Sequence, residues 1–232
     1  MLPFKDNIPT ERFPVITVLI IAINAAVFLY ELTLGAAGQL DAFFSQYGMT
    51  PYEITHGTSL AYRGFPVYMT LITSMFVHAG WLHIGGNMLY LWIFGNNVED
   101  SMGRARFVIF YLLCGLIAGF AQIAIDPSSQ VPNIGASGAI AGILGAYLLL
   151  FPRAKVTTLI FLIVFITVVQ LPAVVVLIFW FLLQVVSGLA GLGTTGDNVA
   201  YFAHIGGFIG GLAMIKLFTL GKHKVHIKRS YM

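Results

Sequence analysis

Two residues of this chain, a serine and a histidine, lie in apolar stretches where polar side chains are uncommon. Ser137 belongs to the sequence Gly-Ala-Ser-Gly at positions 135–138, and His204 precedes closely spaced glycines in a second apolar stretch. A serine hydroxyl becomes an effective nucleophile when a base accepts its proton, and an imidazole with an ordinary pKa of about 6.5 suits that role near neutral pH. We therefore consider Ser137 and His204 as the nucleophile and the general base of an acyl transfer.

A third polar group, formed by His78, His83 and Asn87, precedes the serine in the chain. His83 and Asn87 are four residues apart and share one face of a helix, whereas His78 precedes the start of that helix. The oxyanion of an acyl-transfer intermediate needs hydrogen-bond donors, and we expect Asn87, His83 and the backbone N–H of Ser137 to supply them. For His78, a structural role as a hydrogen-bonded histidine is as good an interpretation as a functional one.

The composition of the chain indicates that these residues lie in a membrane. Hydrophobic residues make up 58% of the 232 residues and charged residues only 9%, whereas soluble domains contain about 25% charged residues. Most of the chain must therefore contact lipid, which excludes a soluble domain. The basic residues of the predicted tail 221–232 are expected to meet anionic lipid headgroups and not nucleic acid.

Runs of apolar residues close to the roughly 20 that cross a bilayer predict six transmembrane helices. We therefore expect an all-α fold, a polytopic membrane protein whose six-helix bundle forms a single domain over residues 1–232. A further apolar stretch, Val156 to Gln170, is interpreted either as an interfacial or re-entrant piece or as the first half of a long fifth helix. The predicted spans are Phe13 to Leu34, Trp81 to Val98, Phe107 to Ile125, Ser137 to Phe151, Ala173 to Leu189 and Tyr201 to Leu220.

The distribution of basic residues sets the expected orientation of these helices. Six spans place nearly all lysines and arginines at one membrane face, and only Arg63 at the other. By the positive-inside rule, the short amino-terminal segment 1–12 and the basic tail 221–232 are then both cytoplasmic. The first outer loop between helices 1 and 2, Gly35 to Gly80, is long and rich in aromatic residues, so we expect it to rest in the outer leaflet.

The rise of a helix places the serine and two of the histidines at a similar depth. Ser137 lies 16 residues before Arg153, which corresponds to about 24 Å along a helix, less than the roughly 30 Å thickness of the hydrocarbon core. The same rise places His83 about 24 Å above Glu99, and His204 about 27 Å above the basic tail. One cavity inside the membrane is therefore expected to hold all three side chains.

Glycine spacing gives two of the predicted helices a way to approach each other closely. Gly138 shares a helix face with positions 142 and 146, and His204 shares one with Gly207 and Gly211. Such stripes, and a serine between glycines, most often serve helix packing alone. Here the packing would also bring the imidazole within about 2.6–3.2 Å of the hydroxyl, as a nucleophile and its base require.

Together, these motifs resemble those of the rhomboid family of intramembrane serine proteases. The resemblance rests on the His78, His83 and Asn87 spacing, on the Gly-Ala-Ser-Gly sequence, and on the glycines after His204. It implies a six-helix rhomboid-like bundle in which Ser137 is the nucleophile and His204 the general base. Asn87 and His83 would contribute to the oxyanion site. The supporting residues would be His78, Gly135, Gly138, Gly207 and Gly211.

The resemblance also implies an activity, the cleavage of single-span membrane proteins within or near their transmembrane segments. Substrates would reach the site laterally beside the fifth helix, and no metal, ATP or other cofactor would be needed. Because the outer halves of the later helices contain no aspartate or glutamate, we expect a Ser-His dyad in place of the usual triad. The expected location is the inner membrane of a prokaryotic cell, where membrane proteins and the lipid bilayer are the partners.

Two positions depart from the pattern of well-studied rhomboids. Those proteins carry a Trp-Arg pair in the first outer loop, whereas Arg63, after Tyr62, is the only lysine or arginine of that loop here. Some members also place a tyrosine one turn after the nucleophile, where this chain has Ala141. The sequence therefore leaves open what anchors the loop and which aromatic residue, if any, orients His204.

Two other functions compete with that of a protease. A non-catalytic rhomboid-like factor that binds membrane proteins normally lacks the serine or the histidine, and this chain retains both. A small transporter or metal carrier would use His78, His83 and His204. It is disfavoured because the chain contains neither a His-Glu-x-x-His zinc motif nor two similar halves.

Overall fold

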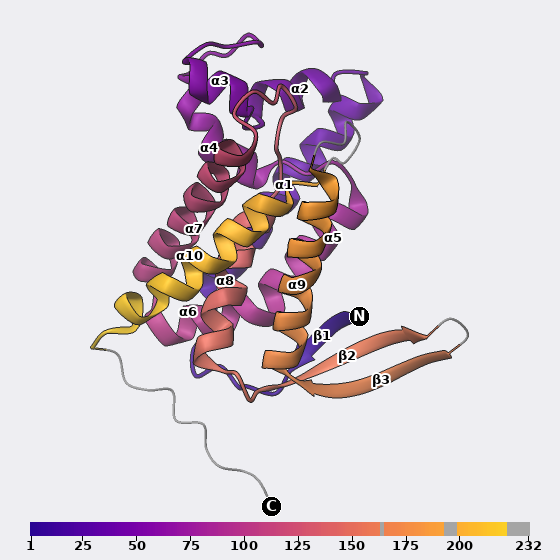
Figure 1. Cartoon of the computed structure of the whole chain (residues 1–232), viewed down its shortest axis with the longest axis vertical. Helices are drawn as coiled ribbons and strands as arrows, with labels where there is room; N and C mark the ends of the chain where they lie inside the picture. Colours follow the sequence, from indigo (N-terminus) through magenta and orange to yellow (C-terminus); the bar gives the residue numbers. More distant parts are fainter. Residues whose placement is uncertain (163–164, 193–198, 222–232) are drawn as a thin grey trace, which may run out of the picture.

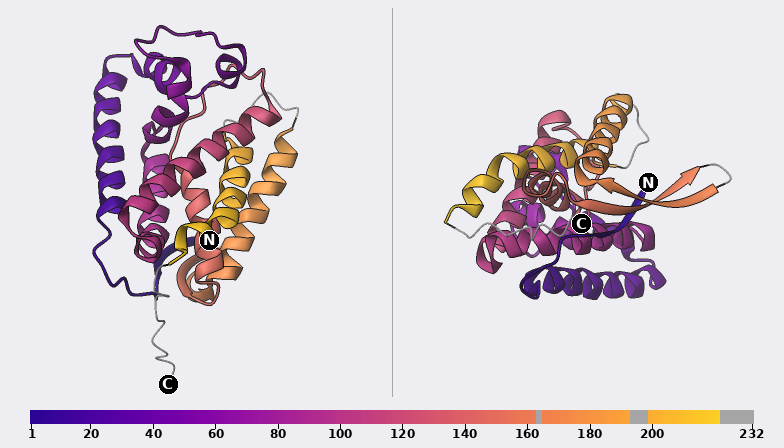
Figure 2. Two further views of the ribbon diagram at one scale, coloured as in Figure 1. Left: turned by 90° about the vertical axis from the view of Figure 1, so that its left-hand side faces the viewer. Right: turned by 90° about the horizontal axis from the view of Figure 1, so that it is seen from below.

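The computed structural model describes residues 1–162, 165–192 and 199–221, and most of these residues are helical (Figure 1). The bundle consists of α1 (Val15–Ala36), α5 (Trp81–Tyr90), a π-helical stretch (Leu91–Gly95), α6 (Asn96–Met102), α7 (Arg104–Ile125), α8 (Ser137–Leu150), α9 (Ala173–Gly191) and α10 (Tyr201–Thr219). The stretch from α5 to α6 is one continuous helix, so helices lie at all six predicted positions. α8 packs against both α7 and α10, whereas α1 stands at one edge of the bundle (Figure 2).

Length and hydropathy identify four of the described helices, α1, α7, α9 and α10, as candidate membrane spans. A fifth candidate is the bent pair Val67–Phe76 and Trp81–Met102, whose two parts meet at 82°. α8, with 14 residues, is shorter than the roughly 20 residues that cross a bilayer. The chain is a multi-pass membrane protein, and membrane crossing by all six helices stays a prediction.

The close approach of α8 and α10 depends on residues without side chains. A Cβ atom at Gly207 would overlap the carbonyl oxygen of Gly138, and a Cβ atom at Gly211 would overlap that of Gly142. Residues 139–147 of α8 are all buried. Because the two backbones touch directly, the start of α8 has a fixed position relative to α10.

A three-stranded antiparallel sheet, which the sequence analysis does not predict, lies at one end of the bundle. Its central strand β2 (Lys155–Leu162) pairs with β1 (Leu2–Asp6) on one side and with β3 (Phe165–Pro172) on the other. The β2–β3 hairpin projects sideways past the end of α9 (Figure 1). The amino-terminal segment 1–12 therefore contributes a strand to the fold.

This sheet corrects two expectations. The chain is mostly helical but not all-α, and the interpretation of Val156 to Gln170 as the first half of a long fifth helix is wrong. The stretch is rich in valine, isoleucine and threonine, whose β-branched side chains favour extended backbone. α9 begins only at Ala173, because Pro172 is tolerated before the first turn of a helix but not in its interior.

Short helices and one buried ion pair organise the segment between α1 and α5, which is the predicted outer loop. Arg63 pairs with Glu53 at 2.5 Å and also donates to the backbone carbonyls of Ser45 and Gln46. Burial alone would raise the pKa of Glu53, but hydrogen bonds from Arg63 and the Leu60 N–H, together with the Arg63 charge, hold that pKa below its ordinary value. Arg63 thus connects distant parts of this segment, which contains no Trp-Arg pair. The helices of this segment are α2 (Leu40–Tyr47), α3 (Pro51–His56) and α4 (Thr70–Thr73), with 3-10 turns at Val67–Met69 and Ser74–Phe76.

Buried carboxylates join elements at the opposite end of the molecule. Glu99 accepts hydrogen bonds from the backbone N–H groups of Ile16 and Thr17 at 3.0 and 2.8 Å, so it satisfies free donors at the start of α1. Asp6 accepts a hydrogen bond from the Tyr147 hydroxyl at 2.5 Å and thereby connects β1 to α8. Burial raises the pKa of Asp6 to about 6, although the hydrogen bond from Tyr147 opposes this shift.

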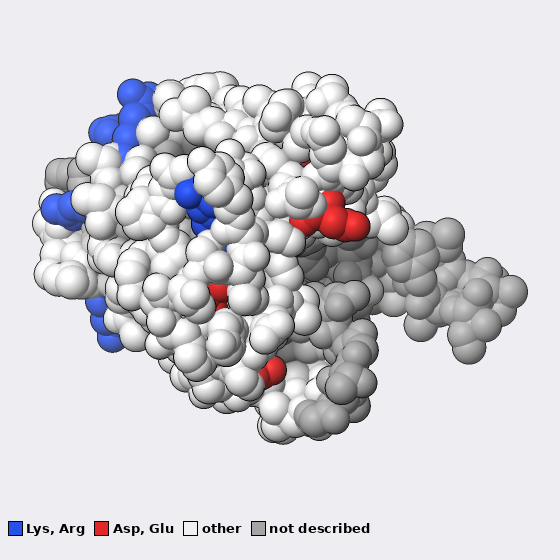
Figure 3. All heavy atoms as spheres, turned by 90° about the horizontal axis from the view of Figure 1, so that it is seen from above, with Lys and Arg blue, Asp and Glu red and all other residues white. Residues whose placement is uncertain are grey.

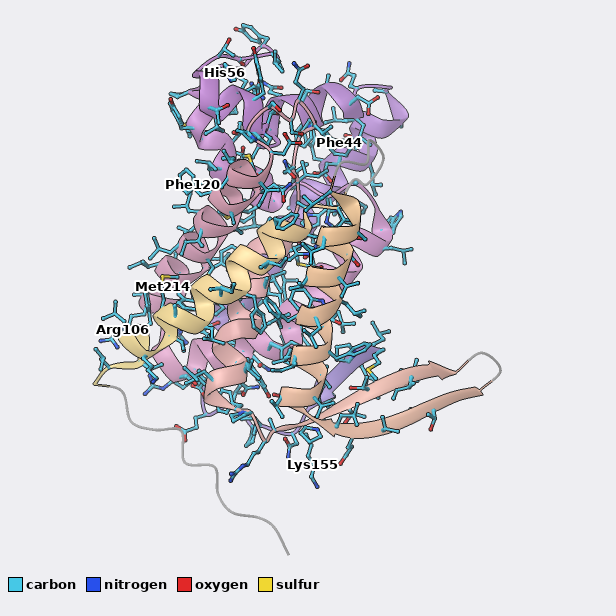
Figure 4. The ribbon with its side chains drawn as sticks, in the orientation of Figure 1. Phe44, His56, Arg106, Phe120, Lys155 and Met214 are labelled. Carbon is cyan, nitrogen blue, oxygen red and sulfur yellow. The ribbon has the colours of Figure 1, made fainter. Side chains whose placement is uncertain are left out.

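Charged side chains are sparse, and labelled basic residues lie at one end. Viewed from the end that carries α2 and α3, most of the surface is uncharged (Figure 3). Arg106 and Lys155 lie at the end opposite to Phe44 and His56 (Figure 4). This arrangement is consistent with basic residues at one membrane face. Most of the predicted basic tail, residues 222–232, lies outside the described residues.

Candidate active site

The structure brings Ser137 and His204 into contact. Ser137 is the first residue of α8, His204 lies in the first turn of α10, and Ser137 Oγ is 2.7 Å from His204 Nε2. This is a normal hydrogen-bond distance, and the glycine-mediated contact between α8 and α10 holds the two helices close enough to allow it. The pair therefore has the geometry that a nucleophile and its base require.

The other ring nitrogen of His204 contacts Gln184, a residue of α9. His204 Nδ1 lies 2.8 Å from Gln184 Oε1, while Gln184 Nε2 donates to the carbonyl oxygen of Trp180 at 3.4 Å. An amide oxygen can only accept, so Nδ1 carries the proton and Nε2 can accept from Ser137. Gln184 therefore favours the tautomer in which His204 can act as a base.

An aromatic residue of α9 flanks the same imidazole. The ring centroids of Trp180 and His204 are 5.9 Å apart with an interplanar angle of 37°. Trp180 thus supplies an aromatic neighbour that Ala141 cannot.

Sequence reasoning missed Gln184 and Trp180. One signal was present, because a glutamine in an apolar membrane helix is costly unless it has a partner. A search for an orienting group that considers only aspartate and glutamate overlooks Gln184. The almost uniformly apolar sequence of α9 also does not indicate which of its faces contacts α10.

His83 lies beside Ser137 and has a proton to donate. Its Nδ1 accepts a hydrogen bond from the Ala79 N–H at 3.3 Å, so the proton of a neutral ring is on Nε2. A Cβ atom at Gly135 would lie 2.6 Å from His83 Nε2 and 3.6 Å from Ser137 Oγ. The Ser137 backbone N–H, at the start of α8, has no partner within the helix. Two hydrogen-bond donors, the His83 Nε2–H and the Ser137 N–H, therefore lie near Ser137 Oγ.

Gly135 is needed at its position for two independent reasons. Its φ of 121° lies in a region that residues with side chains rarely adopt, and any Cβ would press against the His83 ring. Its own N–H donates to the Ser74 carbonyl oxygen at 2.8 Å. This fixes the turn that leads into Ser137.

Within the described part of the chain, neither Asn87 nor His78 forms a hydrogen bond with Ser137. Asn87 Nδ2 donates to the His83 carbonyl oxygen at 3.0 Å, one turn earlier in α5. His78 is buried, packs edge-on against the His83 ring at 5.0 Å, and donates its backbone N–H to Glu31 at 3.1 Å. His78 therefore supports His83, and the oxyanion role of Asn87 stays a prediction.

A small cavity borders Ser137. Its volume is about 50 Å³, and its lining includes Ser74, Asn133 and Ser137 together with small residues of α7 and α8. A single water needs about 10–15 Å³ of such space and two or more polar partners. The cavity beside Ser137 is therefore large enough to admit a water molecule.

The sequence also matches a known protein family. Residues 66–220 match the sequence model of the rhomboid domain, and this range includes every residue of the candidate site. The chain belongs to the rhomboid family. The matched range begins before the bent helical pair and continues to the end of α10, so it covers the whole helical core except α1.

This rhomboid is similar to curated proteins from bacteria and eukaryotes. It is 33% identical over 143 residues to the rhomboid protease GluP of Bacillus subtilis, and 30% identical over 150 residues to Rhomboid protein 1, mitochondrial, of Saccharomyces cerevisiae. It is also 30% identical over 139 residues to Rhomboid-like protein 11, chloroplastic, of Arabidopsis thaliana. These alignments cover 61%, 62% and 60% of this chain, but only 24%, 40% and 43% of the three relatives.

Proposed function

We propose that this rhomboid is a serine endopeptidase that cleaves membrane proteins within or near their transmembrane segments. One observation carries the proposal, the series of contacts from Ser137 Oγ to His204 Nε2 at 2.7 Å and from His204 Nδ1 to Gln184 at 2.8 Å. It supplies a nucleophile, a base and a group that orients the base, which are the parts of a serine hydrolase.

The proposed reaction uses these groups in two stages. Ser137 Oγ attacks the substrate carbonyl while its proton passes to His204 Nε2, and the His83 Nε2–H and the Ser137 N–H stabilise the resulting oxyanion. The imidazolium then protonates the leaving amine, which produces an acyl-enzyme. In the second stage, His204 accepts a proton from water while the water oxygen attacks the acyl carbon. The bond from that carbon to Ser137 Oγ then breaks, the imidazolium returns its proton to Ser137 Oγ, and the acyl group leaves as a carboxylic acid. No step uses a metal ion, ATP or another cofactor.

The position of α9 supports access from the side. Among its 19 residues only Ala173, Val176, Leu177 and Gly188 are buried, so α9 covers the site with few packed side chains. A modest outward movement of α9 would open a path between the bilayer and Ser137. The proposed substrates are therefore single-span membrane proteins that approach within the bilayer. The proposed location is the inner membrane of a prokaryotic cell, with both termini in the cytoplasm.

A covalent probe tests this proposal. The purified chain in detergent should react with a fluorophosphonate at Ser137, and both Ser137→Ala and His204→Ala should abolish the reaction. Ser74→Ala is a matched control, because Ser74 lines the same cavity but does not contact His204, and it should retain the reaction. Equal reaction in the His204→Ala variant would contradict the proposal. Binding of membrane proteins without any reaction at Ser137 would favour the non-catalytic alternative.

A further inference from the structure

A second cavity, far from the nucleophile, opens where α1 and α7 begin. Its volume is about 410 Å³, and three arginines line it, Arg12, Arg104 and Arg106. The carboxylates of Glu99 and Asp100 also border it. The cavity lies at the end of the molecule where Arg106 is seen, opposite to α2 and α3 (Figure 4).

In the described part of the chain, neither carboxylate forms an ion pair with these arginines. Glu99 accepts the backbone donors of α1, and Asp100 Oδ2 accepts the Glu11 N–H at 2.7 Å. The Arg63–Glu53 ion pair lies far from this cavity, in the segment between α1 and α5. Both acids therefore bind backbone donors at or just before the start of α1, and three arginines against two carboxylates leave the cavity with an excess of positive charge.

Two of the three guanidinium groups are free to bind a ligand. Arg106 Nη1 donates to the carbonyl oxygens of Phe218 and Leu220 at 2.9 and 2.8 Å, where it caps the end of α10. Arg12 and Arg104 are exposed, and within the described part of the chain they form no hydrogen bond or ion pair. The first N–H groups of the 22-residue helix α7, from Arg104 onward, add partial positive charge at the same place.

The surroundings of the cavity are apolar and face outward. Phe13 is 66% exposed at its edge, Ile109 is 53% exposed one turn further along α7, and Leu217 is 66% exposed near the end of α10. α1, α7 and α10 are candidate membrane spans, and the contacts of Arg106 place the end of α10 beside the start of α7. A ligand with a charged headgroup and apolar chains could therefore contact the arginines with its headgroup and the apolar side chains with its chains.

We propose that this cavity binds the headgroup of an anionic phospholipid. The phosphate would accept hydrogen bonds from Arg12 and Arg104, whose planar guanidinium groups suit phosphate oxygens better than an ammonium does. The acyl chains would lie along the exposed apolar surface of α7 and α10. Basic pockets at the cytoplasmic ends of membrane helices favour such lipids. The site is independent of the proposed protease activity.

Lipid binding to the purified full-length chain tests the proposal. In native mass spectrometry of the delipidated protein, phosphatidylglycerol should bind more tightly than phosphatidylcholine. Each arginine near a membrane surface contributes about a fivefold increase in affinity for an anionic lipid, so the Arg12→Gln/Arg104→Gln variant should lose about thirtyfold. The Lys5→Gln/Arg153→Gln variant removes the same charge from exposed positions that do not line the cavity, and should stay within about twofold of the parent.

Three outcomes would overturn this assignment. The first is equal binding of phosphatidylglycerol and phosphatidylcholine to the parent protein. The second is an equal loss of phosphatidylglycerol affinity in the two double variants, because that loss would reflect net charge alone. The third is displacement of phosphatidylglycerol by millimolar inorganic phosphate, because the cavity would then recognise the free anion. Matching thermal unfolding curves of the variants confirm that each has folded.

Discussion

Replacement of Gln184 tests how His204, the proposed catalytic base, is oriented. Gln184 Oε1 is 2.8 Å from His204 Nδ1, and loss of this contact would leave the imidazole free to rotate or to change tautomer. A neutral hydrogen bond contributes about 0.5–1.5 kcal/mol net, so Gln184→Ala should lower kcat by roughly two- to thirteen-fold. Loss of the aspartate of a true triad lowers kcat by about 3 × 10⁴, because a carboxylate also stabilises the imidazolium charge.

The assay should separate orientation of the base from general damage to the fold. Cleavage of a fluorogenic transmembrane peptide in detergent would give kcat and KM for each variant. We expect Gln184→Ala to lower kcat with little change in KM, because Gln184 contacts His204. Gln184→Glu retains an acceptor for the Nδ1 proton and should recover part of the rate.

Gln122, which contacts the backbone of α10 beside His204, provides a matched control. Gln122 Oε1 accepts the backbone N–H of Ala203 at 3.2 Å, next to His204 but without contacting its ring. Gln122→Ala should therefore leave kcat within about twofold of the parent value. Unchanged kcat in Gln184→Ala, or an equal loss in both variants, would refute the orienting role.

Three further perturbations test other parts of the account. Gly207→Val should abolish cleavage, because its side chain would separate α8 from α10. Gly85→Ala is the control and should be tolerated, because the space around Gly85 is open. Equal activity of the two variants would contradict a need for close packing of α8 against α10. Arg63→Gln should lower the free energy of unfolding by about 3–5 kcal/mol in denaturant titrations, because it leaves the buried Glu53 unpaired, and a smaller loss is expected for Arg63→Lys. Asp6 has a folded-state pKa of about 6, above the ordinary 3.8, so its favourable contribution is present below pH 3.8 and is lost as the pH rises through 6. The parent should therefore lose thermal stability relative to Asp6→Asn over that range, and the opposite trend would contradict the burial argument.

The helical core and the central pair of residues could be predicted from sequence for physical reasons. Continuous apolar runs mark helices in a membrane protein, because only regular hydrogen bonding satisfies the backbone there. The glycines around Ser137 and those after His204 are visible in the sequence, and their spacing controls how closely α8 and α10 approach. The positions of the helices and the contact of Ser137 with His204 therefore both depend on local sequence patterns.

Features that depend on long-range contacts could not be predicted in this way. The pairing of β1 with β2 joins residues about 150 positions apart, and nothing in the first six residues indicates a partner strand. Gln184 is similar, because its role depends on which face of a uniformly apolar helix meets α10. The Arg63–Glu53 pair also depends on how the chain folds between α1 and α5, and hydrophobic periodicity does not predict the path of such an irregular segment.

Cleavage in a bilayer tests the central claim most directly. The purified chain and a single-span test protein would be reconstituted together in liposomes, and the fragments would be mapped by mass spectrometry. The parent should cut within or beside the transmembrane segment, and Ser137→Ala and His204→Ala should produce no fragment. The same fragments at the same rate from the Ser137→Ala variant would contradict the proposed chemistry.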